Sequence, residues 1–254
     1  MLKETVKSQL TELKLSTAAG ELEPVLASYK KAANLDWVSD LLLREIDARR
    51  EKRLQMRIRR ASFPVLTSLE GFDWEFNPDI DQGKIRELAK LQFVKENGIA
   101  LFLGKTGSGK THLALAIGLL AVTAGEAVYC TSVKKLCADI MQCKMRGRLD
   151  SFFKRMLNAK LWILDDWGVV EMRREVAEEV FDLFDRRKHS SAMIVTSNRE
   201  IEEWPRMFPD QILATATIDR MFESAEIVLF EGDSYRLRGR IMPKTVDRGV
   251  GKID

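Results

Sequence analysis

The sequence predicts an α/β fold in which a five-stranded parallel sheet carries helices on both faces, preceded by a small all-helical domain. Three observations support this. After residue 98, short apolar runs alternate with helical patterns, as in parallel sheets covered on both faces. The first 60 residues show helical spacing and no strand pattern. A glycine-rich loop lies between the first apolar run and the helix that follows it.

Residues 1–60 form the expected helical domain, to which we assign DNA or partner contacts and self-association. Apolar residues keep helical spacing through it, with breaks expected at Gly20 and at 34–36. The positions that define the spacing are Leu2, Val6, Leu10, Leu13, Leu22, Leu26, Tyr29, Trp37, Leu41, Leu42 and Ile46.

Residues 61–82 form an expected linker, because prolines and glycines accumulate there. Its aromatic residues, among them Phe72 and Trp74, are expected to dock onto the next domain. One of them could stack on an adenine ring, although packing in a core is the commoner role of an aromatic side chain.

Residues 83–236 form the expected α/β core, and 237–254 a basic C-terminal tail. Right-handed crossovers would bring the loops at the carboxyl ends of the strands together, where ligands bind. The predicted strands are Ile99–Leu103, Ala127–Thr131, Leu161–Leu164, Met193–Thr196 and Ile227–Phe230.

The glycine-rich loop matches the phosphate-binding pattern G-x-x-x-x-G-K-T. Its backbone N–H groups would converge on phosphates at the positive end of a helix, Lys110 would reach the β and γ oxygens, and Thr111 would offer its hydroxyl to Mg²⁺. A glycine-rich turn without a ligand is the alternative, which the flanking strand and helix disfavour. The expected phosphate-binding residues are Gly104, Lys105, Thr106, Gly107, Ser108, Gly109, Lys110 and Thr111.

Two carboxylates follow the apolar run at Leu161–Leu164. An acidic residue at this place holds Mg²⁺ together with the loop threonine in phosphate-loop proteins, which makes Asp165 the metal candidate. Asp166 would polarise the attacking water as a general base. Many ATPases have glutamate there, and the shorter aspartate suggests slow hydrolysis.

Three further residues are candidates on weaker grounds. Asn198 ends the strand expected beside the Asp165 strand, so its amide could orient water against the γ-phosphate. Arg220 precedes the last predicted strand and Arg236 follows it. An arginine from a neighbouring subunit can stabilise the transferring phosphate, but a surface ion pair of Arg220 with Asp219 or Glu223 is the plainer alternative.

Composition indicates a globular protein that works in a reducing compartment. The 254 residues are 45% hydrophobic and 31% charged, and no run approaches the roughly 20 apolar residues that span a bilayer. The N-terminus lacks a secretory apolar core. The three cysteines suit neither a disulfide framework nor a zinc site, so we expect the cytoplasm.

The net charge of +3 is unevenly distributed. Arg44–Arg60 holds eight basic and three acidic residues, and Lys134–Lys160 holds eight and two. Such basic patches are typical of nucleic-acid binding, although a solvent-exposed helical face without a nucleic-acid partner would show the same pattern. The candidate DNA contacts are Arg49, Arg53, Lys134, Lys144, Arg146 and Arg148.

The order of these parts resembles the AAA+ ATPases, and more closely the IstB-type transposition helpers, relatives of the DnaC-type helicase loaders. The resemblance rests on the phosphate loop, the strand ending Asp-Asp, the strand ending Ser-Asn, Asp-Arg before the last strand, and "EGDSYR" after it. It extends over nearly the whole chain, including "LLLREIDARREKR" and "SLEGFDWEFNPDID".

The resemblance implies a role for each candidate. Gly104–Thr111 would be the Walker A loop, Asp165 and Asp166 the Walker B pair, and Asn198 sensor 1. Arg220 would be an arginine finger acting on a neighbour, and Arg236 a nucleotide-site or interface residue. Lys144, Arg146 and Arg148 would lie on an insertion that faces DNA, and no C-terminal lid domain is expected.

The implied function is an ATP-dependent assembly factor for transposition. It would form a homo-oligomer on duplex DNA, largely without regard to sequence, hydrolyse ATP with Mg²⁺ between subunits, and recruit or remodel its cognate transposase, with no membrane partner. A replicative helicase loader and a non-catalytic ATP-switched DNA adaptor are the alternatives. The sequence contains neither the arginine-rich lid segment expected of a small-molecule kinase nor the N-K-x-D tetrad expected of a GTPase, which disfavours both classes.

Overall fold

The computed structural model describes residues 1–28, 35–188, 190–232 and 234–237. The chain divides into two compact units, Met1–Ser62 and Phe63–Asp254, which are described separately below.

The first unit is helical, with α1 (Leu2–Glu12), α2 (Ser16–Ser28) and α3 (Asp36–Ala61). Its buried core is formed by Val6, Leu10, Ala19 and Leu35. The first break lies at Lys14, whose φ of 61° ends the first helical segment. The break predicted at Gly20 is wrong, because α2 continues through this residue. Of the break predicted at 34–36, residue 34 lies outside the described residues, and Leu35 precedes the first turn of α3.

Helical spacing overstated the apolar face of α3. Trp37 and Leu41 are 67% and 59% exposed, so neither belongs to the core of this unit. Ile46 at the same spacing is buried. A 26-residue helix packed over part of its length leaves some apolar positions in solvent, which periodicity cannot distinguish from core positions.

The second unit is built on a parallel five-stranded sheet with the order β2-β3-β4-β1-β5. The strands are β1 (Ile99–Gly104), β2 (Val128–Ser132), β3 (Leu161–Trp167), β4 (Ala192–Ser197) and β5 (Ala225–Phe230). The predicted fold is confirmed. The strand boundary that differs most is the end of β3, which continues three residues beyond Leu164 and includes both aspartates. The β4 strand lies between β1 and β3, so the phosphate loop after β1 and the acidic end of β3 lie on either side of it.

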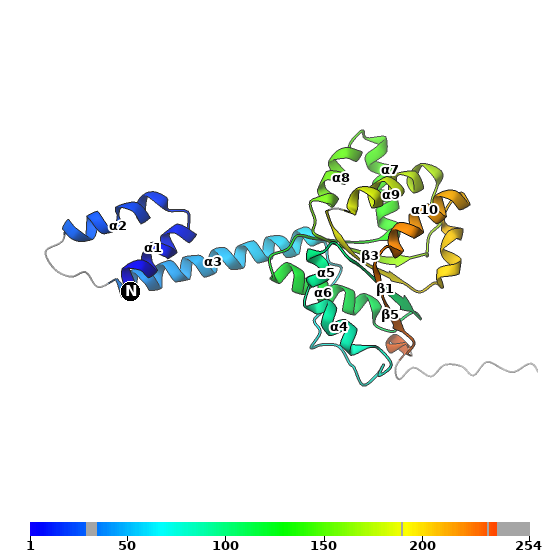
Figure 1. Ribbon diagram of the computed structural model, residues 1–254, viewed down its shortest axis with the longest axis horizontal. Coiled ribbons are helices and arrows are strands. Elements are labelled where there is room, and N and C mark those ends of the chain that lie inside the picture. The colour runs from blue at the N-terminus through cyan, green and yellow to red at the C-terminus, as the bar shows by residue number, and fades with distance from the viewer. Residues whose placement is uncertain (29–34, 189, 233, 238–254) are drawn as a thin grey trace, which may run out of the picture. The chain divides into compact units, whose positions relative to one another are not determined.

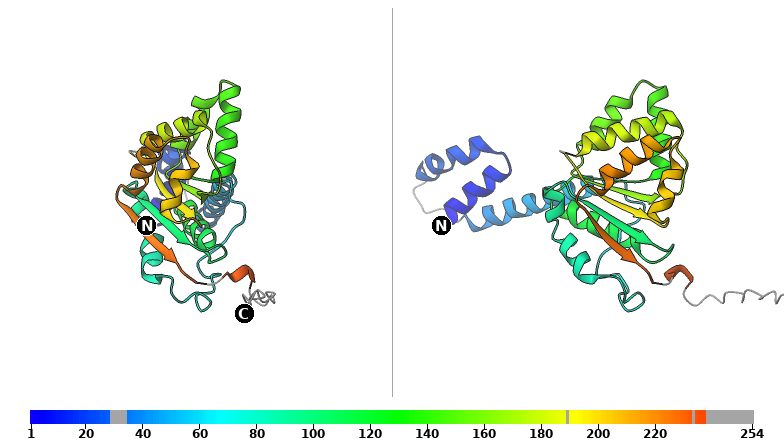
Figure 2. Two further views of the ribbon diagram at one scale, coloured as in Figure 1. Left: turned by 90° about the vertical axis from the view of Figure 1, so that its right-hand side faces the viewer. Right: turned by 45° about the vertical axis from the view of Figure 1, so that its right-hand side comes forward.

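Helices cover both faces of this sheet (Figure 1). On one face lie α7 (Val133–Met145), α8 (Leu149–Leu157), α9 (Arg174–Arg187) and α10 (Gln211–Phe222), with the 3-10 helix η1 (Ile201–Met207). On the other lie α4 (Gln82–Ala89), α5 (Gln92–Lys95) and α6 (Lys110–Thr123), as the second views show (Figure 2). The short η2 (Tyr235–Leu237) follows β5.

The largest core lies between the sheet and the α7–α10 layer. Trp162, Trp167 and Trp204 are fully buried there. Trp167 stacks on Phe184 with ring centroids 5.6 Å apart and meets Trp204 edge to face at 6.0 Å. Aromatic burial of this size gives the strand ends a rigid support. Within the described residues no helix is long and apolar enough to cross a bilayer.

Candidate nucleotide-binding site

A cavity of about 390 Å³ opens at the carboxyl ends of the central strands. The phosphate loop forms one side, and Asp165, Asp166 and Asn198 from the ends of β3 and β4 form another. A third side comes from the segment before the core and from the residues after β5. The lining residues from these two segments are Val65, Thr67, Gly71, Phe72, Asp73, Phe76, Asn77, Tyr235 and Arg236.

Backbone conformation and close neighbours both require glycine at Gly104 and Gly109 of the phosphate loop. Gly104 has φ +142° and its missing Cβ would collide with the carbonyl oxygen of Phe230 on β5. Gly109 has φ +105° and faces the ring of Phe72, whose Cε2 would lie 2.5 Å from an added Cβ. The loop therefore runs close to its neighbours and delivers the first turn of the 14-residue helix α6 to the cavity.

Lys110 is buried in the loop, with 6% of its surface exposed. Its ammonium donates hydrogen bonds to the carbonyl oxygens of Gly104 at 2.7 Å and Lys105 at 2.6 Å. Burial lowers its pKa to about 8, against the opposing attraction of Asp166 and Asp165. An anionic phosphate placed here would supply the counter-charge that this ammonium lacks.

Thr111 and Asp165 are already in contact. The hydroxyl of Thr111 donates to Asp165 Oδ1 at 2.7 Å, and the hydroxyl of Thr196 on β4 donates to the same oxygen at 2.6 Å. The two residues expected to hold Mg²⁺ therefore lie together, as the sequence spacing alone could not establish. Thr196 was missed as a site residue, because a threonine at the end of an apolar strand carries no distinguishing sequence signal.

Asp166 follows in a left-handed backbone conformation, with φ 61°. Its N–H donates to the Thr196 hydroxyl at 3.1 Å. Burial, and next the charge of Asp165, raise the pKa of the Asp166 carboxyl. A carboxylate with a raised pKa that lines a cavity is suited to accept a proton from water.

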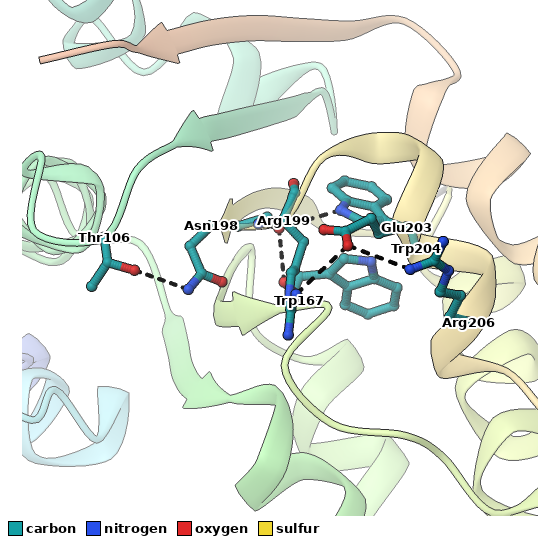
Figure 3. Close-up of polar contacts among 8 residues, drawn as sticks. Thr106, Trp167, Asn198, Arg199, Glu203, Trp204 and Arg206 are labelled. Carbon is teal, nitrogen blue, oxygen red and sulfur yellow. Dashed lines mark hydrogen bonds and ion pairs between the residues drawn. The ribbon is translucent and has the colours of Figure 1, made fainter. Parts of the chain in front are cut away.

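Asn198 reaches across the strand ends to the phosphate loop (Figure 3). Its amide nitrogen donates to the Thr106 hydroxyl at 3.0 Å, and its side chain points away from the tryptophans behind it. The preceding residue is held in place, because the Ser197 hydroxyl donates to the Trp167 carbonyl at 2.8 Å and accepts from the Trp204 indole at 3.2 Å. The amide is thus presented to the cavity by a buried and hydrogen-bonded strand end.

Several lining residues escaped the sequence analysis as individual candidates. His112 meets Phe72 edge to face at 5.3 Å, and its Nε2 lies 3.0 Å from the Ser68 carbonyl oxygen. Asn77 is buried and donates to the Ser108 carbonyl at 3.0 Å. Phe76 contacts Tyr235 at 5.1 Å. Phe72 and Phe76 of the predicted linker thus line the cavity beside the loop.

The two candidate arginines lie in different places. Arg236 lines the cavity and its positive charge contributes to the low pKa of Lys110. Arg220 instead lines a separate hollow together with Asp185 and Glu223. Its Nε donates to Asp185 at 2.8 Å and its guanidinium lies 4.3 Å from the Phe181 ring centroid. The expected alternative partners, Asp219 or Glu223, are replaced by an acid on α9.

The candidate DNA contacts differ in how far they are engaged. On α7 and in the turn before α8, Lys134, Arg146 and Arg148 are exposed, whereas Lys144 forms an ion pair with Glu179 at 2.8 Å. In the first unit, Arg49 pairs with Glu45 and donates to the Leu13 carbonyl, so it also holds α3 against the end of α1. Arg53 Nε donates to the backbone carbonyl of Arg49.

These residues fit a nucleotide with its magnesium ion. The cavity volume is within the usual range of ligand pockets, roughly 300–1,000 Å³. Lys110 and the N-terminus of α6 offer positive charge for phosphates, and Thr111 with Asp165 offers the hard oxygen ligands that Mg²⁺ takes. When bound, Mg²⁺ would neutralise developing charge on the phosphate oxygens.

Comparison with solved structures finds proteins with a similar fold. The AMPPCP-bound DnaA from Aquifex aeolicus matches 69% of this chain and 53% of its own, at 22% identity and a TM-score of 0.55. The DnaC helicase loader matches 58% of this chain and 86% of its own, at 22% identity and a TM-score of 0.51. These similarities show that the chain shares its fold with both proteins.

Comparison of sequences identifies the family. An insertion sequence IS21 ATP-binding protein of Pseudomonas aeruginosa is 36% identical over 231 residues, which are 90% of this chain and 87% of the relative. An IS5376 ATP-binding protein of Geobacillus stearothermophilus is 30% identical over 93% of this chain and 95% of its own. The family described as IstB-like ATP binding protein matches residues 6–242. The chain therefore belongs to the family of IstB-like ATP binding proteins.

Proposed function

We propose that the protein is an ATPase that assists transposition: it binds ATP with Mg²⁺, oligomerises on duplex DNA, and recruits or remodels the transposase of its insertion sequence. The observation that carries this is the convergence of Lys110, Thr111, Asp165, Asp166 and Asn198 on one cavity. Each supplies a part that phosphoryl transfer to water requires.

The work of hydrolysis divides among these side chains. The loop N–H groups and Lys110 hold the phosphates, Thr111 and Asp165 hold the metal, and Asp166 accepts a proton from the attacking water. Asn198, fixed by its bond to Thr106, orients that water. The raised pKa of Asp166 makes it a better proton acceptor than an ordinary aspartate.

We assign Arg220 to a neighbouring subunit's site and Arg236 to the subunit's own site. Arg236 lines the cavity of its own chain, and Arg220 lines a different hollow. A residue that must stabilise phosphate charge and yet lies outside its own cavity can act only on another copy. ATP would then favour assembly, because it completes a site shared by two copies.

The assembled protein would grip DNA through basic residues that carry no sequence information. Lys134, Arg146 and Arg148 are exposed in one stretch of the second unit, and Arg53 extends from α3 in the first. Contacts of this kind go to phosphates and weaken with salt. Deformed DNA and the exposed surfaces of the oligomer would then be what the transposase recognises.

Mixing two inactive variants tests the shared site. Lys110→Ala removes the phosphate contact but keeps Arg220, and Arg220→Ala does the opposite. A 1:1 mixture with ATP and duplex DNA at low salt should regain roughly a quarter of wild-type turnover, since that fraction of random interfaces joins an intact loop to an intact arginine. Mixing Lys110→Ala with Asp166→Asn is the control, because both lesions fall in the same half-site and a finger alone cannot repair either one.

Turnover per wild-type subunit should also rise with protein concentration and with DNA. A flat rate that ignores both would refute the shared site. Co-purification with a hexameric helicase, and not with a transposase, would contradict the proposed partner.

A further inference from the structure

The two acidic residues of the site lie on a β-bulge. The ladder between β3 and β4 pairs Leu164 with Val195 and next pairs Trp167 with Ser197. Asp165 and Asp166 thus lie opposite one residue of β4, Thr196. This two-against-one arrangement defines a bulge, which re-aims side chains and often occurs beside active sites.

The bulge gives both carboxylates access to one cavity. In a regular strand, consecutive side chains point to opposite faces of the sheet. Here Asp166 takes the left-handed conformation with φ 61°, and both Asp165 and Asp166 line the nucleotide cavity. An aspartate in this conformation persists only where its surroundings hold it.

Thr196 is the residue that holds the bulge. Its hydroxyl accepts the N–H of Asp166 at 3.1 Å, and donates its proton to Asp165 Oδ1 at 2.6 Å. One hydroxyl therefore fixes the backbone of one acid and the side chain of the other. Thr196 is 1% exposed and β-branched, so its rotamer is restricted as well.

The next residue of β4 secures the far side of the bulge. The buried Ser197 hydroxyl donates to the carbonyl of Trp167 at 2.8 Å. Trp167 itself is fully buried against Phe184. Ser197 thus anchors the end of β3 after the bulge, and Thr196 anchors the bulge itself. Of these two residues, Thr196 is the one whose hydroxyl contacts both aspartates.

We propose that Thr196 is a positioning residue for hydrolysis, whose hydroxyl sets the geometry of Asp165 toward the metal and of Asp166 toward the attacking water. This inference rests on the proposed ATPase function. Thr196 does not hold the phosphates, since its hydroxyl contacts the two aspartates.

Removing the hydroxyl should therefore separate binding from turnover. In Thr196→Val the N–H of Asp166 loses its acceptor and Asp165 loses one of two hydroxyl donors, so both carboxylates shift. Misplacing catalytic groups by about an ångström costs up to roughly a hundred-fold in rate, and we expect kcat to fall by about ten- to a hundred-fold. The loop contacts of Lys110 remain, so ATP affinity in EDTA should change by less than about twofold.

The experiment compares four full-length proteins: wild type, Thr196→Val, Thr196→Ser and Ser191→Ala. Serine keeps the hydroxyl and should restore most of the turnover. Ser191 is the matched control, because it is fully buried beside the opposite end of β4 and its hydroxyl donates to the Ala159 carbonyl at 2.6 Å, far along the strand from the site. Ser191→Ala should lower the urea midpoint but leave kcat per folded protein unchanged.

A binding readout accompanies the rate. Affinity for a fluorescent ATP analogue is measured with Mg²⁺ and with EDTA. The wild type should bind more tightly with Mg²⁺, and Thr196→Val should lose most of that gain because Asp165 is no longer fixed. If Thr196→Val does not unfold cooperatively, Thr196→Ala replaces it, since alanine removes the hydroxyl without placing a methyl group against the carboxylate.

Two results would overturn the proposal: Thr196→Val within about twofold of wild type in both kcat and the Mg²⁺-dependent gain, or Thr196→Ser as impaired as Thr196→Val. Absence of turnover in the wild type at any DNA concentration would instead refute the ATPase function. In that case the affinities with and without Mg²⁺ still decide whether Thr196 positions Asp165.

Discussion

Replacing Lys110 by methionine should stabilise the nucleotide-free protein while abolishing its response to ATP. Burial lowers the pKa of Lys110 from 10.5 to about 8, a difference that corresponds to about 3 kcal/mol against the charged form. Methionine fills a similar volume without charge. It also loses the hydrogen bonds to the Gly104 and Lys105 carbonyls, worth about 1 kcal/mol each. We therefore expect a net gain of about 1 kcal/mol in the free energy of unfolding at pH 7.

Urea unfolding followed by tryptophan fluorescence measures this gain in stability in the second unit, which contains Lys110. Trp162, Trp167 and Trp204 are fully buried in the core of the second unit, so their signal reports on the unit that contains Lys110. Adding ATP and Mg²⁺ should raise the midpoint of the wild type and leave that of Lys110→Met unchanged, because only a form that binds ligand is stabilised by it.

The pH dependence provides the internal check. The folded pKa of Lys110 lies below its value in the unfolded chain, so between about pH 8 and 10.5 the unfolded chain binds more protons. The penalty is complete below pH 8 and disappears as the pH rises toward 10.5. The stability advantage of the variant over the wild type should therefore fall by about 1–2 kcal/mol between pH 7.5 and 9.5, so that it is lost or reversed at the upper end. A variant less stable than wild type at pH 7, or a difference independent of pH, would refute the reasoning.

Three other outcomes follow from the site and its surface. The affinity of the wild type for ATP should be steady from pH 7 to 8. Above pH 8 the Kd should rise by up to about tenfold per pH unit, because free Lys110 with a pKa of about 8 loses the proton that the phosphates require. Titration of a fluorescent ATP analogue measures this. Asp166→Asn should lower turnover by about a hundred-fold or more while ATP still binds, and equal turnover in this variant would exclude Asp166 from the mechanism. Because burial and Asp165 raise the pKa of Asp166, wild-type turnover should decline on acidification at a pH above the usual range of an aspartate. Replacing Arg146 and Arg148 together by alanine should reduce the slope of log Kd for duplex DNA against log salt concentration by about 2. Lys144→Ala should change this slope less, because the charge of Lys144 is already paired with Glu179. An unchanged slope in the double variant would place the DNA elsewhere.

Some features of the site were available from local sequence alone. The phosphate loop is a contiguous stretch whose glycines, lysine and threonine each have a fixed task, so its position and role could be read directly. The buried strands of a parallel sheet are continuous apolar runs, which is why all five were placed within a few residues of their observed bounds. Asp165 and Asp166 were found because they directly follow one of these runs.

Other features depend on contacts between segments distant in the chain. Helical spacing placed Trp37 and Leu41 on the apolar face of a helix. Only tertiary packing decides which positions of such a face are buried, and these two side chains are exposed. The ion pair of Arg220 with Asp185 joins residues 35 positions apart, and no local pattern favours Asp185 over the nearer acids. Phe72 likewise lies beside the phosphate loop because it packs against His112, a contact between segments distant in the sequence.

The sequence by itself determined the nucleotide loop, the alternation of strands and helices, and the acidic strand end, because each is written in neighbouring residues. The tertiary structure alone decided the order of the strands and, with it, that Thr196 of β4 lies opposite the two aspartates of β3. A bulge is a mismatch in count between two strands, and neither strand contains that information alone. The geometry of the two carboxylates therefore arises from pairing and not from the Asp-Asp motif.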